Sequence, residues 1–140
     1  MAVAISAGQL EELLGRAAFA RVYDFRLHSF AEGECVIEVP FNSELERPGG
    51  IVAGSAYMAA ADVAFWLAIT TVLGEEGEAT VTSQMTTAFL SSAREEAFLA
   101  RARVLKTGRR LVYGEAECTT ETGRLLTHHT LTYARAEARP

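Results

Sequence analysis

Hydrophobic residues recur along this chain at two spacings, and the spacing changes from segment to segment. A period of two predicts a β-strand, because successive side chains of a strand point to opposite faces. Strands are predicted in this way at 23–28, 35–39, 80–90, 98–105, 112–118 and 125–134. A helical period predicts a short amphipathic helix at 7–16, with Ser6 as its N-cap.

Residues 55–73 are apolar around most of a helical circumference, which predicts a long helix that other elements cover on nearly all sides. Gly74 is placed to end this helix before an acidic loop at 75–78. The predicted order is therefore a short helix, a β-hairpin, a buried helix and a meander of strands. An antiparallel sheet wrapped around the long helix satisfies this order, so we expect an α+β fold with one domain at 1–140.

Composition excludes several classes of protein. A net charge of -5 argues against a general nucleic-acid binder, so any recognition of phosphate must be local. Cys35 and Cys118 lie far apart, and with no signal-peptide pattern we expect reduced thiols in a cytoplasmic protein. The run at 55–73 contains Asp62 and Thr70 and lacks basic flanks, so we expect a core helix and no membrane span.

The histidines do not predict a metal site. His28 falls on the polar face of the first predicted hairpin, and His128 and His129 point to opposite faces of the last strand. None of them has an Asp or Glu at the spacing of a zinc-ligand set, so no metal ligands are predicted.

One acidic residue, Asp62, is the first candidate for chemistry. From residue 49 to residue 73 the only other ionisable side chain is Tyr57. A carboxylate buried without partners costs several kcal/mol, unless its surroundings supply partners or a proton. A catalytic role is a reason for a chain to keep such a group, and the glycine-rich turn at 47–55 that precedes it is a second sign of function.

The stretch Gly50-Ile51-Val52-Ala53-Gly54-Ser55, with Asp62 after six further residues, resembles the signature of a known family. It is similar to that of hot-dog-fold acyl-CoA thioesterases of the PaaI-like type, in the 4-hydroxybenzoyl-CoA thioesterase superfamily. The segments at 81–90 and 102–109 are also similar to strands of that family, and the resemblance extends over about 23–133. It implies a hot-dog fold, in which a curved antiparallel sheet wraps a central helix, and hydrolysis of acyl-CoA to a free acid and CoA.

The resemblance also implies roles for single residues. The backbone N–H of Gly54 would stabilise negative charge on the thioester oxygen, and Asp62 would act as general base or as nucleophile. These two residues lie about 12 Å apart along one helix, so the site would need two chains. The resemblance implies a homodimer, and dimers of this kind often pair again into tetramers. Ser55 would donate a hydrogen bond, or else serve only as a helix cap, and Thr82 would orient the attacking water, or else be an ordinary strand threonine.

Coenzyme A would be part of the substrate, and the resemblance implies neither a metal nor a redox cofactor. The cations proposed for its phosphates are Arg94, Lys106, Arg109 and Arg110. The acyl group, medium-chain or aromatic, has candidate pocket residues that are equally interpreted as core: Tyr57, Met58, Phe65 and Trp66.

The chain departs from the family signature at three positions. Ala53 stands where the family usually has His, Arg47 where it often has Asn, and Ser55 where it has a second glycine. A module that binds acyl-CoA without hydrolysing it is therefore the alternative function. A hydratase or dehydratase is disfavoured, because that branch of the fold depends on a catalytic His near the start of its helix.

Overall fold

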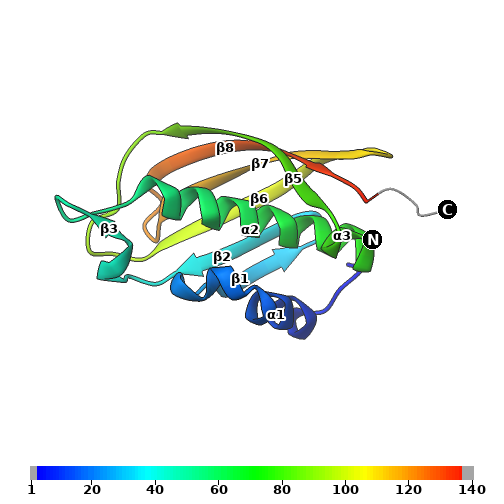
Figure 1. The fold of residues 1–140 in the computed structure, drawn as a ribbon, viewed down its shortest axis with the longest axis horizontal. Coiled ribbons are helices and arrows are strands. Elements are labelled where there is room, and N and C mark those ends of the chain that lie inside the picture. Colours follow the sequence, from blue (N-terminus) through cyan, green and yellow to red (C-terminus); the bar gives the residue numbers. More distant parts are fainter. Residues whose placement is uncertain (1–2, 137–140) are drawn as a thin grey trace.

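The computed structural model describes residues 3–136 and places a six-stranded antiparallel sheet around one long helix (Figure 1). The sheet has the strand order β1-β2-β6-β7-β8-β5. Its strands are β1 (Arg26–Ala31), β2 (Glu34–Val39), β5 (Val81–Phe89), β6 (Phe98–Thr107), β7 (Leu111–Thr120) and β8 (Leu125–Ala134). The remaining elements are α1 (Ala7–Arg16), the 3-10 helices η1 (Ala18–Val22) and η2 (Ser43–Leu45), the short strands β3 (Glu46–Arg47) and β4 (Ile51–Val52), α2 (Gly54–Leu73) and α3 (Glu75–Glu78).

Helix α2 lies across the inner face of the sheet, against β2, β6 and β7, and α1 lies beside β1 (Figure 1). Small residues such as Ala60, Ala64 and Ala68 are fully buried, and their small side chains allow the strands to approach the helix closely. By length and mean hydropathy alone α2 is suited to crossing a membrane, yet about 67% of that stretch is buried inside the protein. The prediction of a long helix wrapped by an antiparallel sheet is confirmed.

One prediction about α2 is wrong in part, because the helix is not covered on nearly all sides. Ser55 and Met58 are exposed, and Asp62 and Trp66 are only half-buried. These residues are spaced three or four positions apart and so form one stripe along the helix. The strand beside this stripe, β5, is an edge of the sheet, and most of its side chains are exposed.

Two local predictions also need correction. The predicted strand at 23–28 extends too far back, since residues 23 and 24 form a turn after η1 and β1 starts only at Arg26. Residues Glu75–Glu78 form a one-turn helix where a loop was expected. Glu75 and Glu76 lie at its N-terminal end, where the backbone N–H groups favour negative charge, and Gly77 provides the close approach to Thr70 that a side chain would prevent.

Pairing within the meander agrees with the predicted faces. Arg103 lies opposite Glu115 in the β6–β7 ladder and forms an ion pair with it at 3.2 Å. His129 is fully buried on the inner face of β8, while its neighbour His128 is half-buried on the other face. Cys35 and Cys118 are buried and unpaired, and burial raises the pKa of each thiol to about 12, so both behave as small apolar groups.

Candidate active site

The carboxylate of Asp62 is held by two hydroxyl groups from neighbouring strands. Thr82 of β5 donates a hydrogen bond to Oδ1 at 2.8 Å, and Tyr133 of β8 donates to the same oxygen at 2.6 Å. The Tyr133 hydroxyl also lies 2.9 Å from the Asp62 backbone oxygen. The half-buried carboxylate therefore has the partners that its place on an apolar helix demands.

Strand register explains why these two hydroxyls meet. Thr82 and Tyr133 are direct partners in the β5–β8 ladder, and α2 places Asp62 within hydrogen-bonding distance of both. Tyr133 is 3% exposed, and its ring packs edge-on against Phe65 with centroids 5.3 Å apart. Burial, and then the charge of Asp62, raise the pKa of the Tyr133 phenol above its ordinary value, so this hydroxyl stays protonated.

Asp62 lines a hollow of about 380 Å³ that lies between α2, η1 and the start of β5. Its walls are largely apolar, and the side chains around the carboxylate include Phe19, Val63, Trp66 and Val81. Trp66 is fixed by a hydrogen bond from its indole N–H to the backbone oxygen of Glu78 at 3.2 Å. A volume of this size suits an acyl group, and it is smaller than a whole acyl-CoA molecule needs.

The N-terminus of α2 is the second part of the site. Ala53 is the N-cap residue and offers no side-chain hydrogen bond, and no described residue accepts a hydrogen bond from the Gly54 N–H. Free amides at a helix start attract negative charge, and the helix dipole adds to this effect. A Cβ at Gly54 would lie 2.9 Å from Cε1 of Phe89, so glycine allows the Phe89 ring to lie against the helix start.

Gly54 and Asp62 both lie on α2, and one chain does not bring them together. Eight positions along α2 separate them by about 12 Å. Ser55, predicted as a hydrogen-bond donor, is exposed at this same helix start, away from Asp62. Thr82 is the one predicted site residue that the structure joins to Asp62 directly.

The predicted phosphate-binding cations fall into two groups at opposite ends of β6, about 30 Å apart. Lys106, Arg109 and Arg110 are exposed at the β6–β7 hairpin, near Tyr133, and have no ion-pair partner among residues 3–136. Arg94 lies at the Gly54 end, where its guanidinium donates to the Gly49 backbone oxygen at 2.7 Å. Arg94 therefore ties the loop before β6 to the turn before α2.

Two of the predicted pocket aromatics belong to the core. Tyr57 and Phe65 are at most 2% exposed, and the Tyr57 hydroxyl accepts a hydrogen bond from the Ala93 N–H at 2.8 Å. Met58 is exposed on the uncovered stripe, and Trp66 lines the hollow as predicted. Sequence reasoning missed Tyr133 and Phe89 as site residues, because their strands meet α2 only in the folded sheet.

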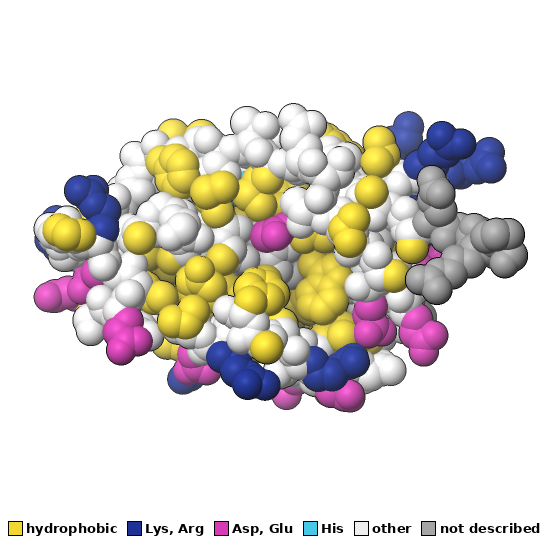
Figure 2. All heavy atoms as spheres, in the orientation of Figure 1, with side chains coloured by type: hydrophobic (Ala, Val, Ile, Leu, Met, Phe, Trp, Pro, Cys, Tyr) yellow, Lys and Arg dark blue, Asp and Glu magenta, His cyan; other side chains and the backbone are white. Residues whose placement is uncertain are grey.

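Hydrophobic side chains gather across the middle of the face that α2 crosses, with one acidic side chain among them, and the other charged side chains lie mostly along its margin (Figure 2). The exposed apolar residues of α2 and β5 include Met58, Val81 and Phe89.

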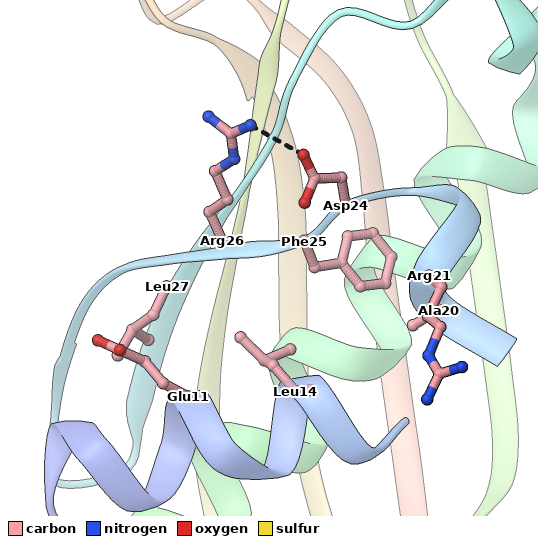
Figure 3. A pocket seen from close by; sticks show the side chains of 9 residues that line it. Glu11, Leu14, Ala20, Arg21, Asp24, Phe25, Arg26 and Leu27 are labelled. Atoms are coloured by element: carbon pink, nitrogen blue, oxygen red, sulfur yellow. Dashed lines mark hydrogen bonds and ion pairs between the residues drawn. The ribbon is translucent and has the colours of Figure 1, made fainter. Parts of the chain in front are cut away.

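A larger hollow of about 500 Å³ lies elsewhere, between α1, η1 and β1 (Figure 3). Two of the charged residues that line it, Asp24 and Arg26, are paired with each other at 2.8 Å, and Asp62 does not line it.

Comparison with known proteins gives consistent results. The family model described as the thioesterase superfamily matches residues 49–127. A curated protein of Saccharolobus solfataricus, SSO2140, whose name assigns it provisionally to the esterases, is 27% identical over 117 residues, which is 83% of this chain and 82% of that protein.

Solved structures share the whole fold. Thioesterase HI1161 of Haemophilus influenzae superposes with a TM-score of 0.86 at 20% identity, over 98% of this chain and 96% of that one. A hypothetical thioesterase of Streptococcus pneumoniae, solved with coenzyme A, gives 0.80 at 17% identity, over 94% of this chain and 99% of that one. At these identities the likeness establishes the fold, and the predicted hot-dog architecture is confirmed.

Proposed function

Since the chain belongs to the thioesterase superfamily, we propose that it hydrolyses acyl-CoA thioesters to a free acid and CoA, at a site shared by two copies. The observation that carries the proposal is the Asp62 carboxylate, held by Tyr133 and Thr82 and open to an apolar hollow. A thioester hydrolase needs a general base or a nucleophile beside an apolar site for the acyl group. Asp62 is suited to the first role and the hollow to the second.

The two-copy site follows from the separation of the two chemical groups on α2. If two α2 helices lie antiparallel along their uncovered stripes, the Gly54 amide of one copy faces the Asp62 carboxylate of the other. Met58 is midway between Gly54 and Asp62 on α2, so it then lies at the two-fold axis. Its side chain is 39% exposed. The edge strand β5 has unpaired backbone groups that suit pairing with a second β5. Pairing of two such dimers into a tetramer stays a prediction.

The same arrangement assigns the substrate's parts. The acyl group, medium-chain or aromatic, lies in the hollow beside Val63 and Trp66. The antiparallel register also brings Arg94 of one copy to the side of the two-fold axis on which the 106–110 hairpin of the other lies. The two groups of cations, separated within one chain, then flank one site and bind the CoA phosphates. The S. pneumoniae structure solved with coenzyme A supports a CoA ligand on this fold.

Two chemical routes fit the carboxylate. As a general base, Asp62 takes a proton from water as the water oxygen attacks the thioester carbon and the C–S bond breaks. As a nucleophile, it forms a mixed anhydride while CoA leaves, and water then hydrolyses the anhydride. In both routes the Gly54 N–H stabilises the oxyanion, and neither route calls for a cofactor. Among residues 3–136, no cluster of three His, Cys, Asp or Glu side chains is arranged to hold a metal ion.

Release of thiol from a panel of acyl-CoA thioesters tests the proposal. The purified chain is mixed with acetyl-, hexanoyl-, decanoyl-, benzoyl- and phenylacetyl-CoA and a thiol reagent. We expect turnover that saturates with substrate and is fastest for a medium-chain or aromatic member. Tight binding of CoA thioesters without release across the whole panel would favour the alternative, a binding module. The specific reason to consider that module is Ala53, which replaces the histidine of the family signature.

A cysteine at Met58 is expected to cross-link two copies. Under mild oxidation, Met58→Cys should give a disulfide-linked dimer on a non-reducing gel, because the proposed two-fold axis brings position 58 of each copy together. The native cysteines are buried, so they should give no background. Leu105→Cys, at an exposed position of β6, is the matched control and should stay unlinked. A monomer in sedimentation that keeps full turnover would contradict the shared site.

A further inference from the structure

Both donors to Asp62 reach the same oxygen. Tyr133 and Thr82 donate to Oδ1, and none of the described residues donates to Oδ2. Taking the proposed hydrolysis as its premise, we propose that Tyr133 is a positioning residue, which fixes the Asp62 carboxylate so that Oδ2 is the oxygen that meets water or the thioester carbon.

Tyr133 is better placed than Thr82 to set this orientation. It belongs to β8, an inner strand paired with β7 on one side and β5 on the other, whereas Thr82 lies exposed on the edge strand β5. The phenol ring is buried and fixed by its edge-on contact with Phe65. Its hydroxyl lies within hydrogen-bonding distance of both Oδ1 and the Asp62 backbone oxygen, at 2.6 and 2.9 Å. The side chain and the backbone of Asp62 are thus tied to one rigid point.

The direction of the hydrogen bond is also fixed. Because burial and the Asp62 charge raise the pKa of Tyr133, the phenol keeps its proton at neutral and mildly alkaline pH and acts as the donor. A donor to Oδ1 holds the carboxyl plane without occupying the lone pairs of Oδ2. The free oxygen then keeps a constant position relative to the hollow, and reactions depend steeply on such placement.

Tyr133→Phe tests the inference, since it removes one oxygen and keeps the ring contact with Phe65. We expect kcat to fall about 10- to 100-fold with KM within about threefold of its starting value, because the hydroxyl touches the carboxylate and not the CoA. Thr82→Val, changed at an exposed position, should lower kcat less, by under about tenfold. Tyr113→Phe is the matched control on the outer face of β7 and should change neither constant.

A double-substitution cycle separates positioning from a purely structural role. In an Asp62→Asn background, Tyr133→Phe should add less than about twofold, because the group it positions no longer reacts. A second loss as large as the first would show that Tyr133 acts elsewhere and overturn the inference. Turnover that stays within about twofold in both Tyr133→Phe and Thr82→Val overturns this inference alone and leaves the proposed function standing. Absence of hydrolysis by the unsubstituted protein overturns both.

Discussion

Replacing Asp62 by asparagine is expected to lower kcat for acyl-CoA hydrolysis by about 10²- to 10⁴-fold, the usual contribution of a positioned general base. The amide can neither take a proton from water nor attack the thioester carbon. Its Oδ1 can still accept the hydrogen bonds of Tyr133 and Thr82, so the local fold should persist. Initial rates of thiol release, measured at several substrate concentrations, give kcat and KM separately.

Binding and folding measurements accompany this prediction. The variant should retain affinity for CoA thioesters and a cooperative thermal transition, which would locate the loss in the chemical step. Turnover within threefold of the unsubstituted protein would remove Asp62 from the mechanism. A single turnover in ¹⁸O-water identifies the nucleophilic route when label enters the Asp62 carboxylate, because this requires an anhydride that water attacks at the Asp62 carbonyl carbon.

Hydrophobic periodicity was enough to predict the helices and strands, because the spacing of apolar residues within one segment determines which element that segment forms. The bounds of α1 agree with the structure, and α2 starts one residue earlier than predicted, at Gly54. The errors lie where local patterns compete with packing. Phe25 continues the alternation of β1, yet it lies before the strand and stacks on Tyr23 with ring centroids 5.0 Å apart.

The site was accessible only where its residues carry a local signature. Asp62 stands out as the acidic residue of an apolar helix, the family resemblance adds Gly54, and both residues lie on α2. Tyr133 carries no such signature, because its link to Asp62 depends on β8 pairing with β5, a strand more than forty residues earlier in the chain. A tyrosine on the inner face of a late strand is indistinguishable from core until that pairing is known.

The uncovered stripe of α2 has a similar explanation. Periodicity shows that the helix is apolar on most sides, but it does not show which side its own sheet leaves open. Met58 and Phe89 are exposed on this face, and their burial requires a second surface. If a second copy supplies that surface, as proposed above, the shared active site and the missing cover for α2 have one common origin.

His129 is expected to make the folded chain sensitive to acid. Its imidazole is fully buried, with Nδ1 2.8 Å from the Thr87 hydroxyl and Nε2 2.8 Å from the Thr127 hydroxyl. Burial, and to a lesser degree the charge of His128, lower the pKa of His129 from 6.5 to about 4. Between these values the unfolded chain binds a proton that the folded chain does not. Stability must therefore fall as the pH is lowered through this range.

The expected loss from this one group is about 3 kcal/mol between pH 6.5 and pH 4, after which its contribution levels off. His129→Gln keeps an amide able to hydrogen-bond both threonines but does not titrate, so it should remove that part of the acid dependence. Urea unfolding followed by Trp66 fluorescence at a series of pH values measures the difference. His28→Gln, exposed on β1, is the matched control and should keep the full acid dependence. An unchanged slope in His129→Gln would mean that the imidazole already accepts its proton in the folded chain, and that its surroundings do not exclude the charge.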